Sequence, residues 1–237
     1  MKTIKIAHLY YDLMNLYGEN GNIKCLEKYL TKQNIKVEVS YLTKDDKINF
    51  NNYDVFYIGS GNNDSFKIAL EDLKKYKDKI NNIMNDKFFI VTGNALNLFG
   101  NKYINKNEII ECLNILNFSS KESKKRFVGE QLYKTTLISE EIIGFENRSS
   151  MLIDNKENYL FESINGFGND KSTKFEGVRH KNFYGTYLLG PLLIRNPYFT
   201  NYLVKEICNK HNIEFIETKD NLEIKAYEEY KNNFLNN

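Results

Sequence analysis

FFIVTGNALNLFG, residues 88–100, combines the features of a buried strand, a sharp turn and a helix. Its four leading apolar residues predict a short buried strand, and residues 95–99 predict a helix that ends at Gly100. A turn between such elements can hold a nucleophile beside the helix N-terminus, where backbone N–H groups and the helix dipole stabilise a thiolate or an oxyanion. This turn contains no cysteine and consists of Thr92, Gly93 and Asn94.

The segments around this stretch alternate between predicted strands and helices. Strands are predicted at residues 4–9, 37–42, 55–58 and 88–91, and helices at residues 23–33, 66–85 and 95–99. Within residues 66–85, apolar side chains recur at spacings of three and four, so one face of the helix is core and the other is solvent. This order predicts an α/β fold with a mainly parallel sheet flanked by helices on both faces.

The second half of the chain has less regular patterns. Residues 107–118 predict a short helix or a helix–strand transition, and residues 119–125 predict a charged loop. Strands are predicted at residues 126–135, 142–146 and 183–188, a turn at residues 166–173, and a helix at residues 197–210. We expect one domain over residues 1–215 and a charged tail over residues 216–237, in which helical, docked and frayed states are all open.

The composition argues against several classes of protein. The 33 basic and 31 acidic residues give a formal charge of +2, so the weak field does not favour nucleic-acid binding. No apolar run approaches the ~20 residues that a membrane span requires. The first four residues lead into a predicted strand without a signal-peptide pattern. The widely spaced cysteines indicate a reduced, cytoplasmic protein without a zinc site; they are Cys25, Cys112 and Cys208.

Two Gly-rich turns follow neighbouring predicted strands. The first runs from Gly59 to Asp64, and the second is the turn at residues 92–94. Ligands of parallel sheets bind at the carboxyl ends of the strands, so the two turns predict a site on one rim. The candidates for an oxyanion loop are Gly59, Ser60 and Gly61, with an ordinary strand-to-helix turn as the alternative.

Several longer motifs, taken in order, resemble those of one family. They are HLYYDLMNLYGENGN at residues 8–22, the loop at residues 59–64, IGFEN at residues 143–147, GFGN at residues 166–169 and YGTYLLGP at residues 184–191. Together they resemble the GatD-type class I glutamine amidotransferases, the CobB/CobQ-like glutaminase subunits related to cobyric acid synthase. The opening motif and the GTYLxGP stretch are the most specific.

The resemblance implies a class I glutamine amidotransferase-like, flavodoxin-like fold and a role in peptidoglycan synthesis. Members of the family pair with a Mur-ligase-like subunit, MurT, and supply ammonia for ATP-dependent amidation of the D-glutamate of lipid II. The expected partners are therefore a MurT-like subunit and glutamine or a related small carboxylate. The resemblance implies no cofactor in this chain, because ATP and Mg²⁺ would be used by the ligase.

Both catalytic positions of the family are substituted. The family's nucleophile lies in a motif of the type CGGYQLLG, and matching backwards from Gly100 places Gly93 at the cysteine, or Thr92 if one residue is inserted. The family's catalytic histidine lies in GTYLHGP, where this chain has Leu189. Glycine cannot form a thioester, leucine cannot transfer a proton, and threonine without an adjacent base is scarcely nucleophilic. A tight turn and a cleft-lining leucine are the structural interpretations of these residues.

Arg126 is the candidate for substrate binding. It begins RFVG, which resembles the family's RxxG stretch, whose arginine holds glutamine through a planar fork. A solvated arginine at the start of a strand is the alternative. His8 and His180 are interpreted as packed or surface residues, and His211 as a helix C-terminal residue favoured by the dipole. Glu19 and Asn20 replace the family's aspartate and arginine, which predicts weaker contacts in the first loop.

Three hypotheses follow. The favoured one is a catalytically degenerate GatD-like subunit that keeps the fold and acts as a scaffold or regulator of the ligase. The second is an active glutaminase whose nucleophile and base come from other positions or from the partner. The third is a small-carboxylate-binding module that uses the helix N-terminus at Asn94 as an anion site.

Overall fold

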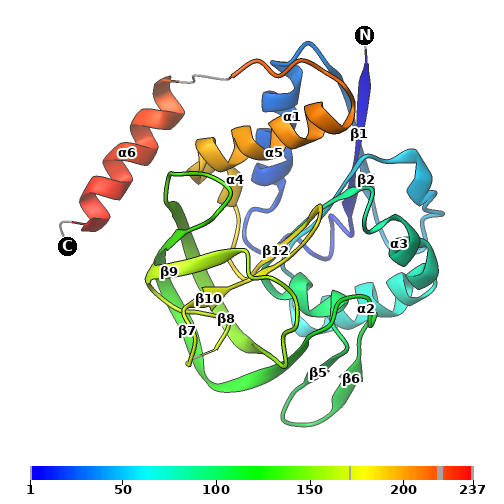
Figure 1. Ribbon diagram of the computed structural model, residues 1–237. Coiled ribbons are helices and arrows are strands. Elements are labelled where there is room, and N and C mark those ends of the chain that lie inside the picture. Colours follow the sequence, from blue (N-terminus) through cyan, green and yellow to red (C-terminus); the bar gives the residue numbers. More distant parts are fainter. Residues whose placement is uncertain (1, 171, 218–220, 236–237) are drawn as a thin grey trace.

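The alternating half of the chain builds a six-stranded sheet in a computed structural model that describes residues 2–170, 172–217 and 221–235 (Figure 1). The strand order is β11-β12-β4-β3-β1-β2. All neighbours are parallel except β11, which is antiparallel to β12. The strands are β1 (Thr3–Leu9), β2 (Lys36–Leu42), β3 (Val55–Ile58), β4 (Phe88–Thr92), β11 (Val178–His180) and β12 (Phe183–Thr186).

Helices cover both faces of this sheet, because successive side chains of each strand point to opposite sides. Ile6, Tyr57 and Ile90 join the core beneath α1 (Asn20–Thr31), α4 (Leu192–Arg195) and α5 (Pro197–Lys210). Ala7, Phe56 and Phe89 join the core beneath α2 (Asn63–Lys74), α3 (Lys77–Ile83) and the 3₁₀ helix η2 (Gly93–Phe99). The predicted α/β class is confirmed.

Two predicted helices differ in detail. The expected helix at residues 66–85 is two helices, α2 and α3, and Tyr76 between them leaves the helical conformation. The expected helix at residues 95–99 is η2, which starts earlier, at Gly93, and winds as a 3₁₀ helix. A further short 3₁₀ helix, η1, precedes β3 at Phe50–Asn52.

A second, mostly antiparallel sheet packs beside the first, in green and yellow in Figure 1. Its order is β10-β9-β7-β5-β6, and β8 pairs with β7. Its strands are β5 (Lys102–Ile104), β6 (Ile109–Glu111), β7 (Ser119–Lys134), β8 (Ile142–Ile153), β9 (Phe161–Asn165) and β10 (Phe175–Glu176).

This sheet overturns two predictions. Residues 107–118 contain β6 and no helix, and the expected charged loop at residues 119–125 is the start of β7. The lysines there belong to the exposed side of a long strand whose pairing with β8 shifts between Glu122 and Phe127. That bulge breaks the two-residue alternation by which a strand is recognised in sequence.

The tail contains helix α6 (Asn221–Leu235), drawn in red in Figure 1. Tyr227 donates a hydrogen bond to the Glu141 carbonyl at 2.9 Å, and Glu223 pairs with Lys28 at 2.6 Å. The helix therefore contacts both α1 and the start of β8. Residues 218–220 and 236–237 of the predicted tail lie outside the described residues.

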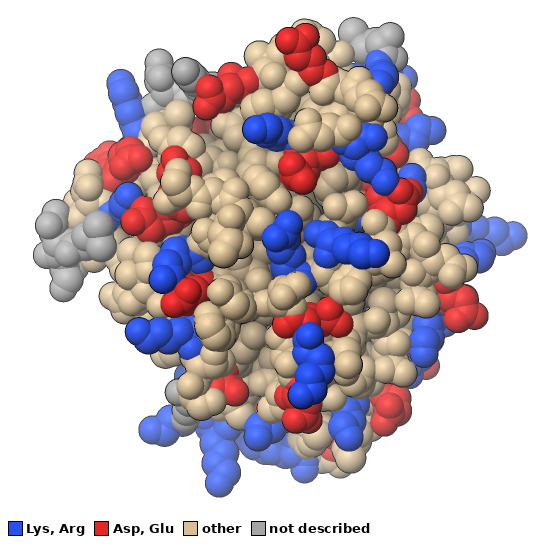
Figure 2. Space-filling view, viewed as in Figure 1, with Lys and Arg blue, Asp and Glu red and all other residues tan. Residues whose placement is uncertain are grey.

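The surface mixes both signs of charge. Figure 2 shows acidic and basic side chains interspersed over the viewed face, in keeping with the small net charge. Within the described ranges, no helix has the length and apolar character needed to cross a membrane.

Candidate functional site

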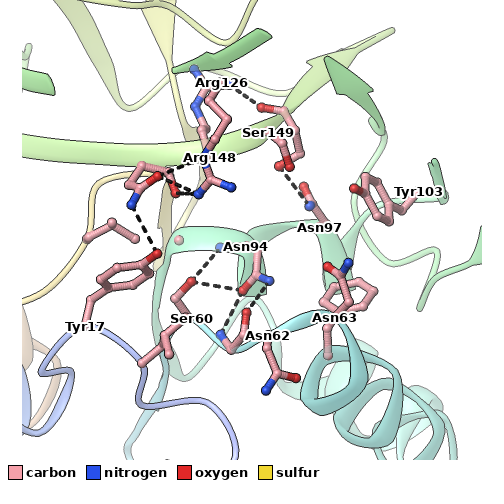
Figure 3. A pocket seen from close by; sticks show the side chains of 17 residues that line it. Tyr17, Ser60, Asn62, Asn63, Asn94, Asn97, Tyr103, Arg126, Arg148 and Ser149 are labelled. Carbon is pink, nitrogen blue, oxygen red and sulfur yellow. Dashed lines mark hydrogen bonds between the residues drawn. The ribbon is translucent and has the colours of Figure 1, made fainter. Parts of the chain in front are cut away.

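A cavity of about 340 Å³ lies at the carboxyl edge of the parallel sheet, between that edge and strands β7 and β8 (Figure 3). The loops that follow β1, β3, β4 and β12 line one side of it. On that side we define the elbow wall as Ser60, Gly93, Asn94 and Leu189. On the opposite side we define the strand wall as Arg126, Asn147, Arg148 and Ser149.

Gly93 lies at the centre of the elbow wall, with a φ of 61° that favours glycine. A Cβ atom built on it would come within 2.6 Å of both Cβ and Oγ of Ser60, and within 3.1 Å of Cδ2 of Leu189. The structure thus brings together three of the predicted site residues. None of the three offers a thiol or an imidazole.

Thr92, the alternative for the nucleophile, does not line the cavity. Its side chain is buried beneath the elbow, where Oγ1 donates to Glu19 at 2.8 Å and lies 2.9 Å from the Tyr57 hydroxyl. The predicted oxyanion loop divides in the same way. Ser60 and Gly61 line the cavity, whereas Gly59 packs on Glu19 so closely that an added Cβ atom would collide with it.

Asn94 ties the elbow to the loop after β3. The N–H of Gly61 donates to its Oδ1 at 3.0 Å, and its Nδ2 donates to the Gly61 carbonyl at 2.7 Å. The Ser60 hydroxyl also donates to Oδ1, at 3.1 Å. From the sequence, Asn94 was predicted only as part of a helix N-terminus. The contacts of its side-chain amide were not predicted, because no local pattern indicates which loop that amide reaches.

Glu19 lies beneath the elbow wall and is fully buried. Its carboxylate accepts hydrogen bonds from Tyr57, Thr92, and the backbone N–H groups of Ser60 and Gly190. That these contacts are weaker than those of the family's aspartate stays a prediction. The longer glutamate side chain reaches groups on three other segments. Burial raises the pKa of Glu19, and the hydrogen bonds from Tyr57 and Thr92 oppose that shift.

The strand wall carries an exposed guanidinium. Arg126, the candidate for substrate binding, lines the cavity, and its Nε and Nη2 donate to Oδ1 of Asn147 at 3.0 and 2.5 Å. Nδ2 of Asn147 donates in turn to the Tyr17 hydroxyl at 3.3 Å, which connects the strand wall to the loop after β1. The sequence analysis quoted Asn147 within IGFEN without assigning it to the site.

Arg148, the buried member of the strand wall, is held by several hydrogen bonds and by two aromatic rings. It donates to Glu146 at 2.9 Å and to the Gly168 carbonyl at 2.5 Å, and it stacks between the rings of Phe127 and Tyr187. Burial raises the pKa of Glu146, against the charge of Arg148. Burial and the charge of Glu146 raise the pKa of the neighbouring Glu176 to about 8. Glu146 and Arg148 lie on the buried side of β8, although sequence alternation would place these charged residues on the exposed side.

The histidines lie away from the cavity lining. Burial lowers the pKa of His8 to about 4, and its ring packs against Tyr57 at 5.2 Å. His180 lies between Glu157 and Asn85, at 2.8 and 3.0 Å. His211 lies 3.6 Å from Asp54.

The cysteines are buried and also lie away from the cavity lining. Burial raises the pKa of Cys25 and Cys112 to about 12 and raises that of Cys208, so the thiolate forms are disfavoured. Among the described residues, no group of three or more His, Cys, Asp or Glu side chains is placed to hold a metal ion.

Residues 5–197 match the CobB/CobQ-like glutamine amidotransferase domain. The lipid II isoglutaminyl synthase (glutamine-hydrolyzing) subunit GatD of Staphylococcus aureus (strain N315) is 32% identical over 218 residues, or 91% of this chain and 88% of that protein. The protein of the same name from Streptococcus pneumoniae (strain ATCC BAA-255 / R6) is 31% identical over 234 residues, or 96% and 90%. A crystal structure of a glutamine amidotransferase superposes with a TM-score of 0.56 at 12% identity, covering 87% of this chain and 99% of that one, which supports the fold alone.

Proposed function

This chain belongs to the family of CobB/CobQ-like glutamine amidotransferase domains, and we propose that it is a GatD-like subunit of a lipid II isoglutaminyl synthase that does not hydrolyse glutamine. The proposal rests on one observation. Gly93 and Leu189, at the family's nucleophile and histidine positions, face each other across the elbow wall without a reactive atom.

The chemistry of glutamine hydrolysis needs both missing groups. A thiolate must attack the side-chain amide, and a general acid must protonate the departing ammonia. In other hydrolases, removing such a unit lowers turnover by on the order of 10⁶. The buried cysteines and the distant histidines supply no substitute at the cavity, which disfavours an active glutaminase with displaced residues.

In the proposed role, the chain acts as a scaffold or regulator of a MurT-like Mur ligase subunit. That ligase would bind ATP and Mg²⁺ and would take free ammonia in place of ammonia from glutamine. The chain keeps the whole fold and an open cavity. This supports a structural or sensing role over the alternative of a chain without any function.

The test is amidation of lipid II by the copurified chain and its Mur-ligase-like partner, with glutamine or ammonium chloride as the nitrogen source. We expect product with ammonium chloride and none above background with glutamine. An active GatD–MurT pair, assayed in parallel, controls for ligase activity. Glutamine-dependent product, accompanied by labelling of a cysteine of this chain with a glutamine-like electrophile, would favour the active-glutaminase alternative.

A second candidate function, a small-carboxylate-binding module, is favoured by Arg126. Its guanidinium is exposed at a cavity of a size suited to a small ligand, and Nη1 is not among the atoms that contact Asn147. Calorimetric titration with glutamine and glutamate tests it, since a purely structural subunit would give no heat of binding.

A further inference from the structure

We infer that Asn94 and Ser60 occupy the oxyanion site of the elbow, so that restoring the missing cysteine and histidine would not by itself restore glutamine hydrolysis. The inference rests on the proposed function and extends it. Besides the two substituted catalytic positions, it identifies occupied oxyanion donors as a third obstacle to glutamine hydrolysis. It concerns the backbone donors of the elbow and not the two catalytic side chains.

An oxyanion site of this type is made from backbone N–H groups. At a strand–turn–helix elbow, the donors are the N–H of the residue after the nucleophile and an N–H from an adjacent loop, aimed at the point where negative charge develops. In this chain the corresponding groups are the N–H of Asn94 and those of Ser60 and Gly61, because the loop after β3 lies against Gly93.

Each of these three donors is directed at an oxygen of the chain itself. The N–H of Gly61 donates to Oδ1 of Asn94 at 3.0 Å, and the N–H of Ser60 donates to Glu19 at 3.3 Å. The N–H of Asn94 points at Oγ of Ser60, at 3.5 Å. Side-chain oxygens of Asn94 and Ser60 therefore already accept the hydrogen bonds of two of the three donors, as Figure 3 shows.

Ser60 also fills the space that a nucleophile would need. A Cβ atom at Gly93 would come within 2.6 Å of both Cβ and Oγ of Ser60, a separation that real Cβ atoms do not show. A cysteine placed here would have to displace Ser60, which is bonded to Asn94. Ser60 thus blocks the space for a nucleophile, and Asn94 holds Ser60 in place and occupies the N–H of Gly61.

In the hydrolysis itself, a thiolate adds to the amide carbon, and its carbonyl oxygen becomes the oxyanion. The C–N bond then breaks as the amide nitrogen takes a proton from the imidazolium and leaves as ammonia. Water hydrolyses the resulting thioester to glutamate and returns the thiol. Removing a single oxyanion donor in other enzymes costs 10²–10³ in turnover. Losing access to the donors is expected to cost at least as much.

The experiment compares two variants of the full chain, each purified with its ligase partner. The first carries Gly93→Cys and Leu189→His, and the second adds Ser60→Gly and Asn94→Gly. We expect ammonia release from glutamine by the second to exceed that by the first by at least about 100-fold. A matched control adds Asn63→Gly and Ser149→Gly to the first variant instead, because these residues line the same cavity away from the elbow wall. We expect no gain from the control.

Equal rates for the first and second variants would overturn the inference, whether both are high or both remain at background. Circular dichroism verifies that each variant is folded. Independently, Asn94→Ala alone should speed hydrogen exchange of the Gly61 amide at least tenfold and leave the amides of β1 unchanged. An unchanged Gly61 amide would also overturn it. Glutamine hydrolysis by the unmodified chain would instead contradict the proposed function.

Discussion

The two walls of the cavity differ in how their polar groups are used. On the elbow wall, the polar atoms of Ser60 and Asn94 bond to each other and to Gly61, and the other two members are the apolar Gly93 and Leu189. On the strand wall, Arg126 keeps an exposed guanidinium that faces the cavity. The polar groups of the elbow wall are thus bonded within the protein, whereas the strand wall presents a positive charge to the cavity.

The foundations of the two walls differ as well. The elbow wall rests on Glu19, whose hydrogen-bond donors are neutral hydroxyl, amide and backbone groups. The strand wall rests on Glu146 and Glu176, with Arg148 as the cation. Buried carboxyls that position the loops are thus present beneath both walls. Under the proposed function, these buried carboxyls remain although the catalytic side chains are absent.

Among the substitutions, the largest loss of stability at a fixed pH is expected from Glu19→Ala, which removes the hydrogen-bond acceptor beneath the elbow wall. It leaves the buried Tyr57 and Thr92 hydroxyls without an acceptor and opens a cavity, so the free energy of unfolding should fall by roughly 2–4 kcal/mol. Urea unfolding measures it. Glu71→Ala is the control, because Glu71 pairs with Lys74 in solvent and should cost below about 0.5 kcal/mol. Equal losses would show that Glu19 is not a support.

The next effect is a pH dependence under the strand wall. The folded pKa of Glu176 is about 8, well above the value of about 4.5 for the unfolded chain, so only the folded state holds this proton between those values. Stability should therefore fall as pH rises through this window, by at most about 1.4 kcal/mol per pH unit from this group. Glu176→Gln keeps the bonds to Thr186 and Tyr187 without a charge.

Thermal unfolding of the wild type and Glu176→Gln from pH 5 to pH 9 measures this difference. The variant should lose less stability than the wild type as the pH rises. Comparison with the wild type removes the opposite contribution of His8, whose pKa is lowered to about 4. Parallel curves for the two proteins would mean that Glu176 is ionised in the folded state.

Arg126→Ala tests whether the strand wall is open to a ligand. If the chain binds glutamate or glutamine, loss of charge-assisted hydrogen bonds worth roughly 1.5–3 kcal/mol should weaken binding about 10- to 100-fold in calorimetry. Stability should change little, since the side chain is exposed. Lys125→Ala serves as the control, because Lys125 does not line the cavity. Equal weakening by both would indicate a general field effect.

The smallest effect is a coupling within the elbow wall. Gly93→Ala should cost about 1–2 kcal/mol from the left-handed conformation alone, and contact with Ser60 adds to it. In a Ser60→Gly background the contact is gone, so the cost should drop by about 0.5 kcal/mol or more. A double-mutant cycle by urea unfolding gives the value. Additive costs would mean that the loop moves freely away from Gly93.

The sequence predicts this molecule best where periodicity is local. The strands around residues 4–9, 55–58 and 88–91 and the helix at residues 197–210 occur as expected, because each shows its own apolar pattern. The start of β7 and the strand β6 were missed, since a bulge and short strand lengths hide the alternation.

For the site, the sequence named several residues that line the cavity but not their long-range contacts. Motif matching placed Gly93, Ser60, Leu189 and Arg126, and the fold brings all four to one cavity. The roles of Glu19 and Asn94 depend on segments distant in sequence, and no local pattern encodes such contacts. The same holds for Asn147, whose partners are Arg126 and Tyr17.

The carboxylate of Glu19 has a consequence for the order in which the protein folds. It bonds to Tyr57, 38 residues away, and to Thr92, 73 residues away, and it also accepts the N–H of Gly190. Contacts that close such long loops form slowly, because the chain loses much entropy before they stabilise it. The rim of the cavity is therefore expected to form after the individual helices. During synthesis, the carboxylate of Glu19 would stay exposed to water until the segment with Gly190 has been made and has folded onto it.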